Sequence, residues 1–277
     1  MKLIADSGST KTHWVIILPE GQIKSLYSQG INPYFLDVDE ISRIVKECFI
    51  AFPTGEIKEV YFYGAGCSIA EKCSQVAAAL SVVFPSAKIV THSDLLAAAH
   101  ALFGKANGVV SILGTGSNAA VYNGKDFEKK IQSLGYLLGD EGSGSYIGRQ
   151  LLQSYLRKEM PSKLRNEFRK DFELELPFVL EHLYKKAFPN RYLASFATFA
   201  SKFREDDFIQ NILRNSFQDF IHYQLDVLDF DKNIPVGFVG SVAFYFQEIL
   251  KDELIKSGYQ FAQVLKNPIE QLQEYYK

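Results

Sequence analysis

Residues 2–18 read KLIADSGSTKTHWVIIL, an apolar run, a turn rich in Gly, Ser and Thr, and a second apolar run. This pattern is typical of two strands joined by a tight turn. Residues 109–122, VVSILGTGSNAAVY, repeat the plan. Glycine lets a backbone approach a ligand closely, and consecutive N–H groups with Ser or Thr hydroxyls form an anion-binding nest. One such turn alone indicates a hairpin, but two matched turns predict a polyphosphate held between two halves of the chain.

Outside the hairpins, strand-like and helical signals alternate, which predicts an α/β fold with a partly parallel sheet. Residues 148–229 are mainly helical in pattern, and their aromatic and leucine side chains are expected in a core. The last clear strand is expected at 235–240, followed by a helix continuing to about 255. The other expected elements are strands at 59–66 and 88–91 and helices at 70–84 and 95–103.

A chain of 277 residues predicts two domains. The boundary is expected near residues 105–108, LysAlaAsnGly. The two domains are therefore expected to span 1–107 and 108–265, with a C-terminal helix at about 266–277 packing back on the first domain. The second domain would carry a helical insertion. The sequence contains no GxxxxGK[ST] loop and no GxGxxG opening a helix after a strand, so neither hairpin is a Walker or dinucleotide-binding loop.

Charge and composition narrow the class of partner. The formal net charge of −2 provides no basic field for nucleic acid or an anionic membrane, so we expect a small-molecule partner. No signal peptide and no run of about 18 apolar residues is recognised, which favours a cytoplasmic location. The cysteines Cys48, Cys67 and Cys73 lack CxxC spacing and are expected to be reduced thiols, with metal binding by Cys67 and Cys73 as the weaker alternative. The five histidines show no HxH or HExxH spacing, so no histidine-based zinc site is expected.

Two acidic positions are candidates for chemistry. Asp94 follows a predicted strand and precedes a predicted helix, so Ser93 or Asp94 would cap that helix. A carboxylate at the carboxyl end of a strand is also where α/β sheets bind ligands, and position alone does not separate the two roles. Asp140 and Glu141 lie among four glycines in residues 135–144, which indicates a backbone close to a ligand, with a solvated turn as the alternative.

Together these segments resemble a known family. Residues 6–12 look like the first phosphate motif, and 114–118 like the second, of the superfamily that contains acetate and sugar kinases, heat-shock chaperone ATPases and actin. Residues 135–144, with the core LGDEGSG, are similar to the most distinctive stretch of the N-acetylglucosamine kinase family, which is grouped with the BadF/BadG-type ATPases. Residues 237–243 resemble the adenosine motif. The resemblance implies two actin-like (ribonuclease H-like) domains, each with a mixed five-stranded sheet flanked by helices, around a cleft for ATP and sugar.

The resemblance also implies roles for individual residues. Asp94 would be the catalytic base that accepts the proton of the sugar hydroxyl, and Asp6 would hold Mg²⁺ through water. The ATP contacts would be Gly8, Ser9, Thr10, Lys11, Thr115, Gly116, Gly240 and Ser241. The sugar contacts, besides Asp94, would be Asn32, Ser117, Asn118, Gly135 and Asp140.

The expected activity is in-line transfer of the ATP γ-phosphoryl group to a hydroxyl, at the 6-position, of N-acetylglucosamine or N-acetylmuramic acid, with ATP and Mg²⁺ as cofactors. Relatives carry Gly-Gly-Trp-Gly before the LGDEG stretch, where this chain has Ser133, Leu134 and Gly135. Because that region contacts the sugar in relatives, the identity of the amino sugar stays open, with glucosamine as an alternative. The zinc-binding cysteine motif of the ROK-type kinases is absent. A homodimer is compatible with the resemblance.

Two other functions are compatible with parts of the pattern. The first is an ATP-driven activator of a radical dehydratase, which would hold an iron–sulfur cluster between subunits through cysteines such as Cys67. The second is a non-catalytic nucleotide sensor or filament protein of actin type. Asp94 and the LGDEGSG stretch argue against the second, because a filament needs no sugar site.

Overall fold

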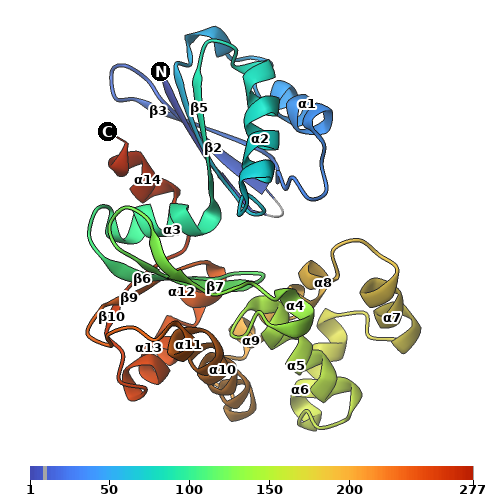
Figure 1. Ribbon diagram of the computed structural model, residues 1–277. Helices are drawn as coiled ribbons and strands as arrows, with labels where there is room; N and C mark the ends of the chain where they lie inside the picture. The colour runs from blue at the N-terminus through green and yellow to red at the C-terminus, as the bar shows by residue number, and fades with distance from the viewer. Residues whose placement is uncertain (9–10, 277) are drawn as a thin grey trace. The chain divides into compact units, whose positions relative to one another are not determined.

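The computed structural model describes residues 1–8 and 11–276. The chain divides into two compact units, one formed by Met1–Lys105 with Pro268–Lys277 and the other by Ala106–Asn267. Each unit contains one five-stranded mixed sheet with helices packed against it (Figure 1). The predicted α/β fold with two such sheets is therefore confirmed.

The sheet of the first unit has the strand order β3-β2-β1-β4-β5. Strand β1 pairs antiparallel with β2 and parallel with β4, and β4 pairs parallel with β5. Three strand ends therefore meet at one edge of the sheet, where α/β proteins bind ligands. The strands are β1 (Lys2–Ser7), β2 (Lys11–Ile17), β3 (Ile23–Gln29), β4 (Glu59–Gly64) and β5 (Lys88–Ser93).

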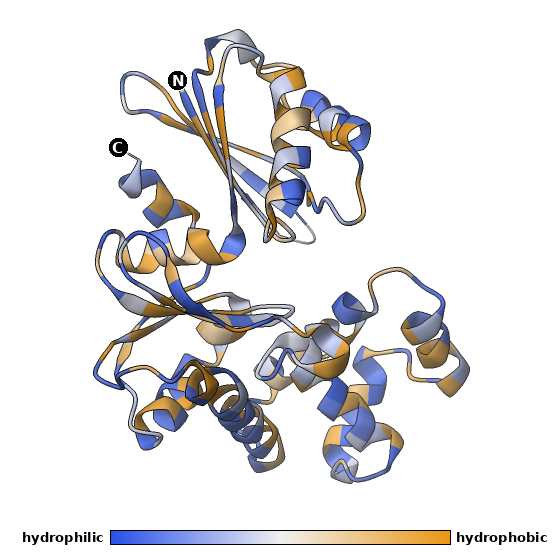
Figure 2. Cartoon of the chain, viewed as in Figure 1, coloured by the Kyte–Doolittle hydropathy of each residue, from blue (hydrophilic) through white to orange (hydrophobic). Residues whose placement is uncertain are grey.

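Helices pack against this sheet because its central strands are apolar on both faces. Leu3 and Ala5 of β1 belong to a core shared with Ile41 of α1 and Leu80 of α2, whereas Ile4, between them, is buried on the opposite face. Figure 2 shows hydrophilic and hydrophobic residues along the same helix α1, as expected for a helix with one buried side. The helices are α1 (Val38–Cys48), η1 (Thr54–Glu56), α2 (Ala70–Val83), α3 (Asp94–Phe103) and α14 (Ile269–Tyr275).

The last helix, α14, belongs to the first unit although it ends the chain. It packs against α3 and β1. The Lys2 ammonium group donates to the Tyr276 carbonyl at 2.8 Å, and the Tyr61 and Tyr276 rings stack with centroids 3.9 Å apart. The C-terminal residues thus support the face of the sheet that carries α3.

The sheet of the second unit has the order β10-β9-β6-β7-β8, in which β6 pairs antiparallel with β7 and parallel with β9. The strands are β6 (Gly108–Leu113), β7 (Ser117–Tyr122), β8 (Phe127–Lys130), β9 (Val236–Val239) and β10 (Phe261–Leu265). The sequence pattern does not predict strand β10, since the last clear strand-like run is that of β9. Its pattern is weak since it lies at the sheet edge and two of its five residues are exposed.

The helices of the second unit build a phenylalanine-rich core around Phe168, Phe196, Phe199 and Phe217, as the pattern of residues 148–229 predicted. The expected continuous helix after β9 is instead two helices, because Phe246 ends α12 with φ −116° and ψ 24°. The helices are α4 (Gly135–Leu138), α5 (Gly144–Leu156), α6 (Ser162–Asp171), α7 (Leu176–Tyr184), α8 (Pro189–Ser195), α9 (Ala197–Lys202), α10 (Asp207–Phe220), the π-helical turn η2 (Ile221–Leu225), α11 (Asp226–Leu228), α12 (Ser241–Tyr245) and α13 (Gln247–Lys256). In the part of the chain that the structure describes, no helix is long and apolar enough to cross a membrane.

Candidate functional site

The first hairpin turn follows β1 in the first unit. The Gly8 amide donates to the Lys11 carbonyl at 3.1 Å, which closes the turn. The Lys11 ammonium group is exposed and lies 5.2 Å from the centroid of the Tyr27 ring. Two of the predicted phosphate contacts, Ser9 and Thr10, lie outside the described residues.

Two carboxylates lie at the carboxyl ends of strands in this sheet. Asp6 lies at the end of β1, and Asp94 follows the end of β5, with only β4 between the two strands. Burial raises the pKa of Asp94. Burial and then the charge of Asp94 raise the pKa of Asp6 to about 7, against an opposing effect of Lys11. Two partly buried acids that repel each other make a site suited to a cation or to a shared proton.

In the structure the residue that caps helix α3 is Ser93 and not Asp94. Ser93 is the N-cap of α3, and its hydroxyl accepts a hydrogen bond from the Leu96 amide. Asp94 is the first residue of the helix, where its Oδ1 accepts a hydrogen bond from the Leu95 amide at 2.9 Å. One oxygen of a carboxylate in the first helical turn is thus left for a ligand.

Asn32 is held next to the same sheet edge by a second serine. The Ser7 hydroxyl, which is fully buried, accepts from the Ile31 amide at 3.0 Å and fixes the start of the 31–34 turn. Asn32 Oδ1 accepts from the Tyr34 amide at 3.0 Å, so its amide nitrogen is the group left to donate. Gly66, with φ 87°, lies against this side chain, because a Cβ there would come within 2.6 Å of Asn32 Oδ1.

The second hairpin turn lies between β6 and β7 in the second unit, and the acidic loop 139–144 covers it. The Gly144 amide donates to the Gly114 carbonyl at 2.8 Å, and the Ser145 amide donates to the Thr115 carbonyl at 3.0 Å. Asp140 Oδ1 accepts from the Ser117 amide at 3.2 Å. The turn and the loop, which are distant in sequence, therefore form one structure.

Asp140 is the most constrained residue of this loop. It is 9% exposed and has φ 56°, a left-handed conformation uncommon for a residue with a side chain. Burial raises its pKa to about 6, and the Ser117 amide opposes that rise. A Cβ at Gly116 would come within 2.9 Å of Asp140 Oδ2, so only glycine lets the turn and the acid approach so closely.

Two other predicted sugar contacts lie nearby in the same unit. Asn118, the second residue of β7, engages its Oδ1 with the Ala119 amide at 2.9 Å. Gly135, with φ 70°, begins the short helix α4, which has no buried residue. Leu134 immediately before it is 56% exposed, so the position that departs from the family's glycine- and tryptophan-containing pattern presents an apolar side chain at the surface of this unit.

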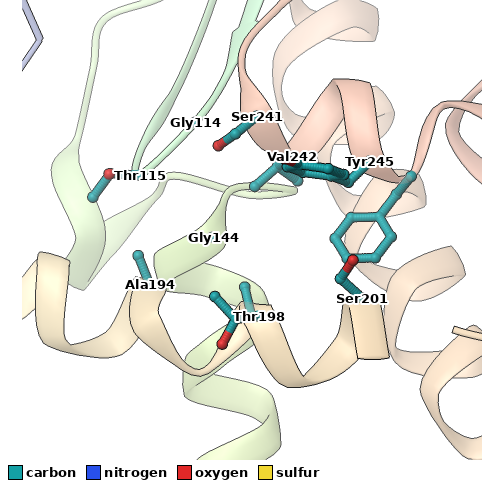
Figure 3. A pocket seen from close by; sticks show the side chains of 11 residues that line it. Gly114, Thr115, Gly144, Ala194, Thr198, Ser201, Ser241, Val242 and Tyr245 are labelled. Atoms are coloured by element: carbon teal, nitrogen blue, oxygen red, sulfur yellow. The ribbon is translucent and has the colours of Figure 1, made fainter. Parts of the chain in front are cut away.

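A cavity of about 530 Å³ opens beside the second turn, entirely within the second unit. Figure 3 shows Thr115 and Ala194 on one side of it and Ser241, Val242 and Tyr245 on the other. Its volume lies in the range that holds a small organic ligand. The sequence identified Thr115 and Ser241 here but not the residues of α8, α9 and α12 that complete the wall, Ala194, Ala197, Thr198, Ser201, Tyr245 and Phe246.

Gly240 allows β9 and the second turn to meet at this cavity. Its φ is 132°, and a Cβ on it would lie 2.2 Å from the Leu113 carbonyl oxygen. Any side chain at this position would therefore force the start of α12 away from the turn. The predicted adenosine contacts Gly240 and Ser241 thus lie next to the turn that carries the predicted phosphate contacts Thr115 and Gly116, and Ser241 and Thr115 both line the cavity.

Two of the three cysteines, Cys67 and Cys73, lie next to each other in the first unit. Cys67 is 3% exposed, burial and neighbouring Cys73 raise its pKa to about 12, and the Cys73 thiol donates to the Cys67 carbonyl at 3.4 Å. Among the described residues, no group of three His, Cys, Asp or Glu side chains could hold a metal ion.

Two mixed sheets, each begun by a hairpin with a Gly-, Ser- and Thr-rich turn, and a cavity beside one turn define the actin-like ATPase fold. A family model for the BadF/BadG/BcrA/BcrD ATPase family matches residues 5–272. The chain belongs to this family, and the resemblance expected from its motifs is confirmed.

Solved structures with the same fold include three sugar-kinase relatives. A proposed N-acetylglucosamine kinase from Porphyromonas gingivalis is 37% identical, with 100% of this chain and 98% of that one covered and a TM-score of 0.94. A proposed N-acetylglucosamine kinase from Chromobacterium violaceum is 16% identical over 100% and 98%, with a TM-score of 0.74. A ROK family glucokinase from Streptomyces griseus, in complex with glucose and AMPPNP, is 15% identical over 99% and 97%, with a TM-score of 0.57. No curated protein matches the chain at a significant level.

Proposed function

We propose that this protein is an ATP-dependent kinase that phosphorylates an N-acetylated amino sugar, N-acetylglucosamine or N-acetylmuramic acid, on its 6-hydroxyl. The observation that carries the proposal is the cavity that opens directly from a phosphate-type turn. Its wall joins Gly114 and Thr115 to Ser241 and Tyr245, so a nucleoside in it would have its phosphates at the turn. The Porphyromonas relative, similar over its whole length, supports a sugar as the acceptor.

Asp94 supplies the base in this proposal. Its Oδ1 is held by the Leu95 amide, which fixes the carboxylate while Oδ2 stays available to a hydroxyl. Its raised pKa makes it a better proton acceptor than an exposed aspartate. Phosphoryl transfer depends mostly on positioning and charge neutralisation, so a well-fixed base that takes the proton late is sufficient.

Asp6 fits an Mg²⁺ site of the water-mediated kind. Mg²⁺ prefers oxygen ligands and keeps several of its waters, and the repulsion between Asp6 and Asp94 is relieved by a divalent cation. When bound, Mg²⁺ would neutralise charge on the ATP phosphates. Lys11, which is exposed, would add a second positive charge near Asp6, whose pKa it lowers against the effect of burial.

In this proposal the sugar is recognised by polar side chains that can each make a further hydrogen bond. Asn32 and Asn118 both use their side-chain oxygen on a backbone amide, which leaves their nitrogens to donate. Asp140, when ionised, would accept from a sugar hydroxyl. A site built from hydrogen-bonding groups discriminates strongly against an analogue that lacks the partner group.

The test is ATP consumption by the purified protein with glucose, glucosamine, N-acetylglucosamine and N-acetylmuramic acid at equal concentration. We expect both acetylated sugars, or one of them, to give kcat/KM at least about tenfold above glucose. Omission of sugar and the Asp94→Asn variant are the controls for background hydrolysis. If glucose matches the acetylated sugars, amino-sugar specificity is wrong, and if no sugar stimulates ATP use, the kinase assignment is wrong.

A further inference from the structure

Gln224 is a buried polar residue that no sequence motif marks. It lies on the π-helical turn η2, between α10 and α11, and is 4% exposed between the buried Ile221 and Leu225. A π-helical turn adds one residue to a helical turn and occurs most often at functional sites. The turn directs an amide into the interior, beside β7.

The side-chain nitrogen of Gln224 joins the two segments of the candidate site in this unit. Gln224 Nε2 donates to Ser117 Oγ at 2.6 Å and to Glu141 Oε2 at 3.1 Å. Ser117 begins β7 directly after the second turn, and Glu141 follows Asp140 in the acidic loop. One amide therefore contacts both the hairpin and the loop.

The chemistry of the amide fixes the direction of these bonds. A carboxylate accepts, so the nitrogen and not the oxygen of Gln224 faces Glu141. Since an amide nitrogen has two hydrogens and can only donate, its second hydrogen goes to Ser117 Oγ. Ser117 then acts as acceptor toward Gln224, and its own hydroxyl hydrogen is available to another acceptor.

The other end of the amide makes this arrangement costly. Gln224 Oε1 is buried and has no hydrogen-bond partner among the described residues. A buried acceptor without a partner costs about 1–3 kcal/mol, and an apolar side chain of similar length would avoid that cost. An amide at this position is therefore best explained by its two donated bonds.

We infer that Gln224 is a positioning residue. By donating to Ser117 Oγ it orients the Ser117 hydroxyl to donate to an acceptor oxygen of the sugar, and by donating to Glu141 it links Ser117 to the acidic loop. The inference rests on the proposed function for the identity of the ligand. It does not depend on that function for the bonds among residues 117, 141 and 224, which can be tested without a substrate.

The first experiment compares wild type with Gln224→Met, which keeps the length of the side chain and removes both donors. We expect kcat/KM for the best sugar of the panel to fall about 10- to 100-fold, because a donated bond to Ser117 and one to Glu141 are lost. The KM for ATP is expected to stay within about threefold, since Gln224 does not line the nucleotide cavity. Wild-type sugar kinetics in Gln224→Met would overturn the inference.

The second experiment tests whether Gln224 orients the Ser117 hydroxyl or only stabilises the fold, by exchanging the side chains at 141 and 224. In Gln224→Glu the new carboxylate faces Glu141, and Ser117 must donate to it. In the double variant Glu141→Gln/Gln224→Glu the 141–224 bond is restored with reversed direction, but Ser117 still donates inward. We expect the double variant to recover the Tm of wild type and not its sugar kcat/KM; recovery of both would overturn the donor role of Ser117.

A pH series of Tm decides the inference even if wild type phosphorylates no sugar. The acid introduced at 224 would be buried and would face the Glu141 carboxylate, so its folded pKa would be raised and Gln224→Glu should lose stability as pH rises from about 4 through that pKa. The double variant, with one acid, should lose much less. A Gln224→Glu curve parallel to wild type would show that the two side chains do not meet, and the inference would fail independently of the kinase proposal.

Discussion

The two hairpin turns are both rich in Gly, Ser and Thr, but the described residues around them make different contacts. The first is fixed at its base, where the buried Ser7 hydroxyl bonds the Ile31 amide and the Ser7 carbonyl accepts from the Ala65 amide at 2.9 Å. The second is fixed at its top, where the amides of Gly144 and Ser145 donate to carbonyls of the turn. In the first unit the neighbours are carboxylates, and in the second they are an acidic loop and an apolar cavity.

We infer from this difference that the two hairpin turns have different roles although their sequences are similar. Bonds to the carbonyls of the second turn orient its peptide groups, which preorganises it for a ligand. Bonds at the base of the first turn instead position Asp6 and the chain leading to Asn32. The comparison predicts that changes near the first turn affect phosphoryl transfer, Mg²⁺ and the sugar contact of Asn32, whereas changes near the second affect the nucleotide and the other sugar contacts.

The largest expected effect is that of Asp94→Asn. Loss of a general base lowers kcat by about 10²- to 10⁴-fold. ATP affinity should be nearly unchanged, because the cavity proposed for the nucleotide is lined only by residues of the other unit. Steady-state kinetics at saturating sugar measures the first quantity, and calorimetric titration with AMPPNP the second. A kcat within about tenfold of wild type would refute the role of Asp94.

Asp6→Asn should weaken the use of MgATP and also change how the stability of the protein depends on pH. We expect kcat/KM for MgATP to fall about 10- to 100-fold, as for residues that act on a metal through its water. Since the folded pKa of Asp6 is raised to about 7, wild type should lose stability as pH rises from about 4 to 7. The variant should lack the part of that loss that comes from Asp6 and keep the part that comes from Asp94, whose pKa burial also raises.

Mg²⁺ provides the matched control for Asp6. Added Mg²⁺ should raise the Tm of wild type more at pH 8 than at pH 5, because the ionised acid is the form that binds. Asp6→Asn should show no such pH-dependent gain. An equal gain in both proteins would place the cation elsewhere.

A smaller, pH-dependent effect is expected at the second turn. If ionised Asp140 binds the sugar, wild-type kcat/KM should fall as pH drops below about 6, the raised pKa of this residue. Asp140→Asn should lower kcat/KM about tenfold at pH 8 and remove the part of the fall that titrates near pH 6, while the part that comes from Asp6 near pH 7 stays. A variant that keeps the wild-type pH profile would assign the transition to another group.

Much of this arrangement could be predicted from local sequence. The hairpins at β1–β2 and β6–β7 follow from apolar runs around Gly-rich turns, and the helical signal at 70–84 corresponds to α2. Edge strand β10 and the break at Phe246 depend on tertiary packing, which local patterns do not encode. The cavity wall from Ala194 to Ser201 has no motif, because small side chains at a helix surface look like any core-facing pattern.

Gln224 shows a different limit of sequence reasoning. A lone glutamine in a helical segment is normally solvent-exposed, and a π-helical turn has no signature in composition. Its partners Ser117 and Glu141 lie 107 and 83 residues away. The sequence identified Ser117 and the acidic loop, and only the structure shows what joins them.

The smallest predicted effect compares one buried serine in each hairpin. Ser7→Ala removes a hydroxyl that accepts from the Ile31 amide and leaves that buried donor without its partner, so it should destabilise the protein by about 1–3 kcal/mol. Ser111→Ala on β6 is the matched control, because the Ser111 hydroxyl is buried and has no hydrogen-bond partner among the described residues. Its removal should be neutral or slightly stabilising. Urea unfolding with unchanged m-values measures both free energies.

The Ser7 variant should also raise the KM for sugar, since Ile31 precedes Asn32, while the Ser111 variant should not. Equal stability loss in the two variants would mean that the hydroxyl at the base of the first turn has no special role, and the contrast between the two turns would then lie only in the second.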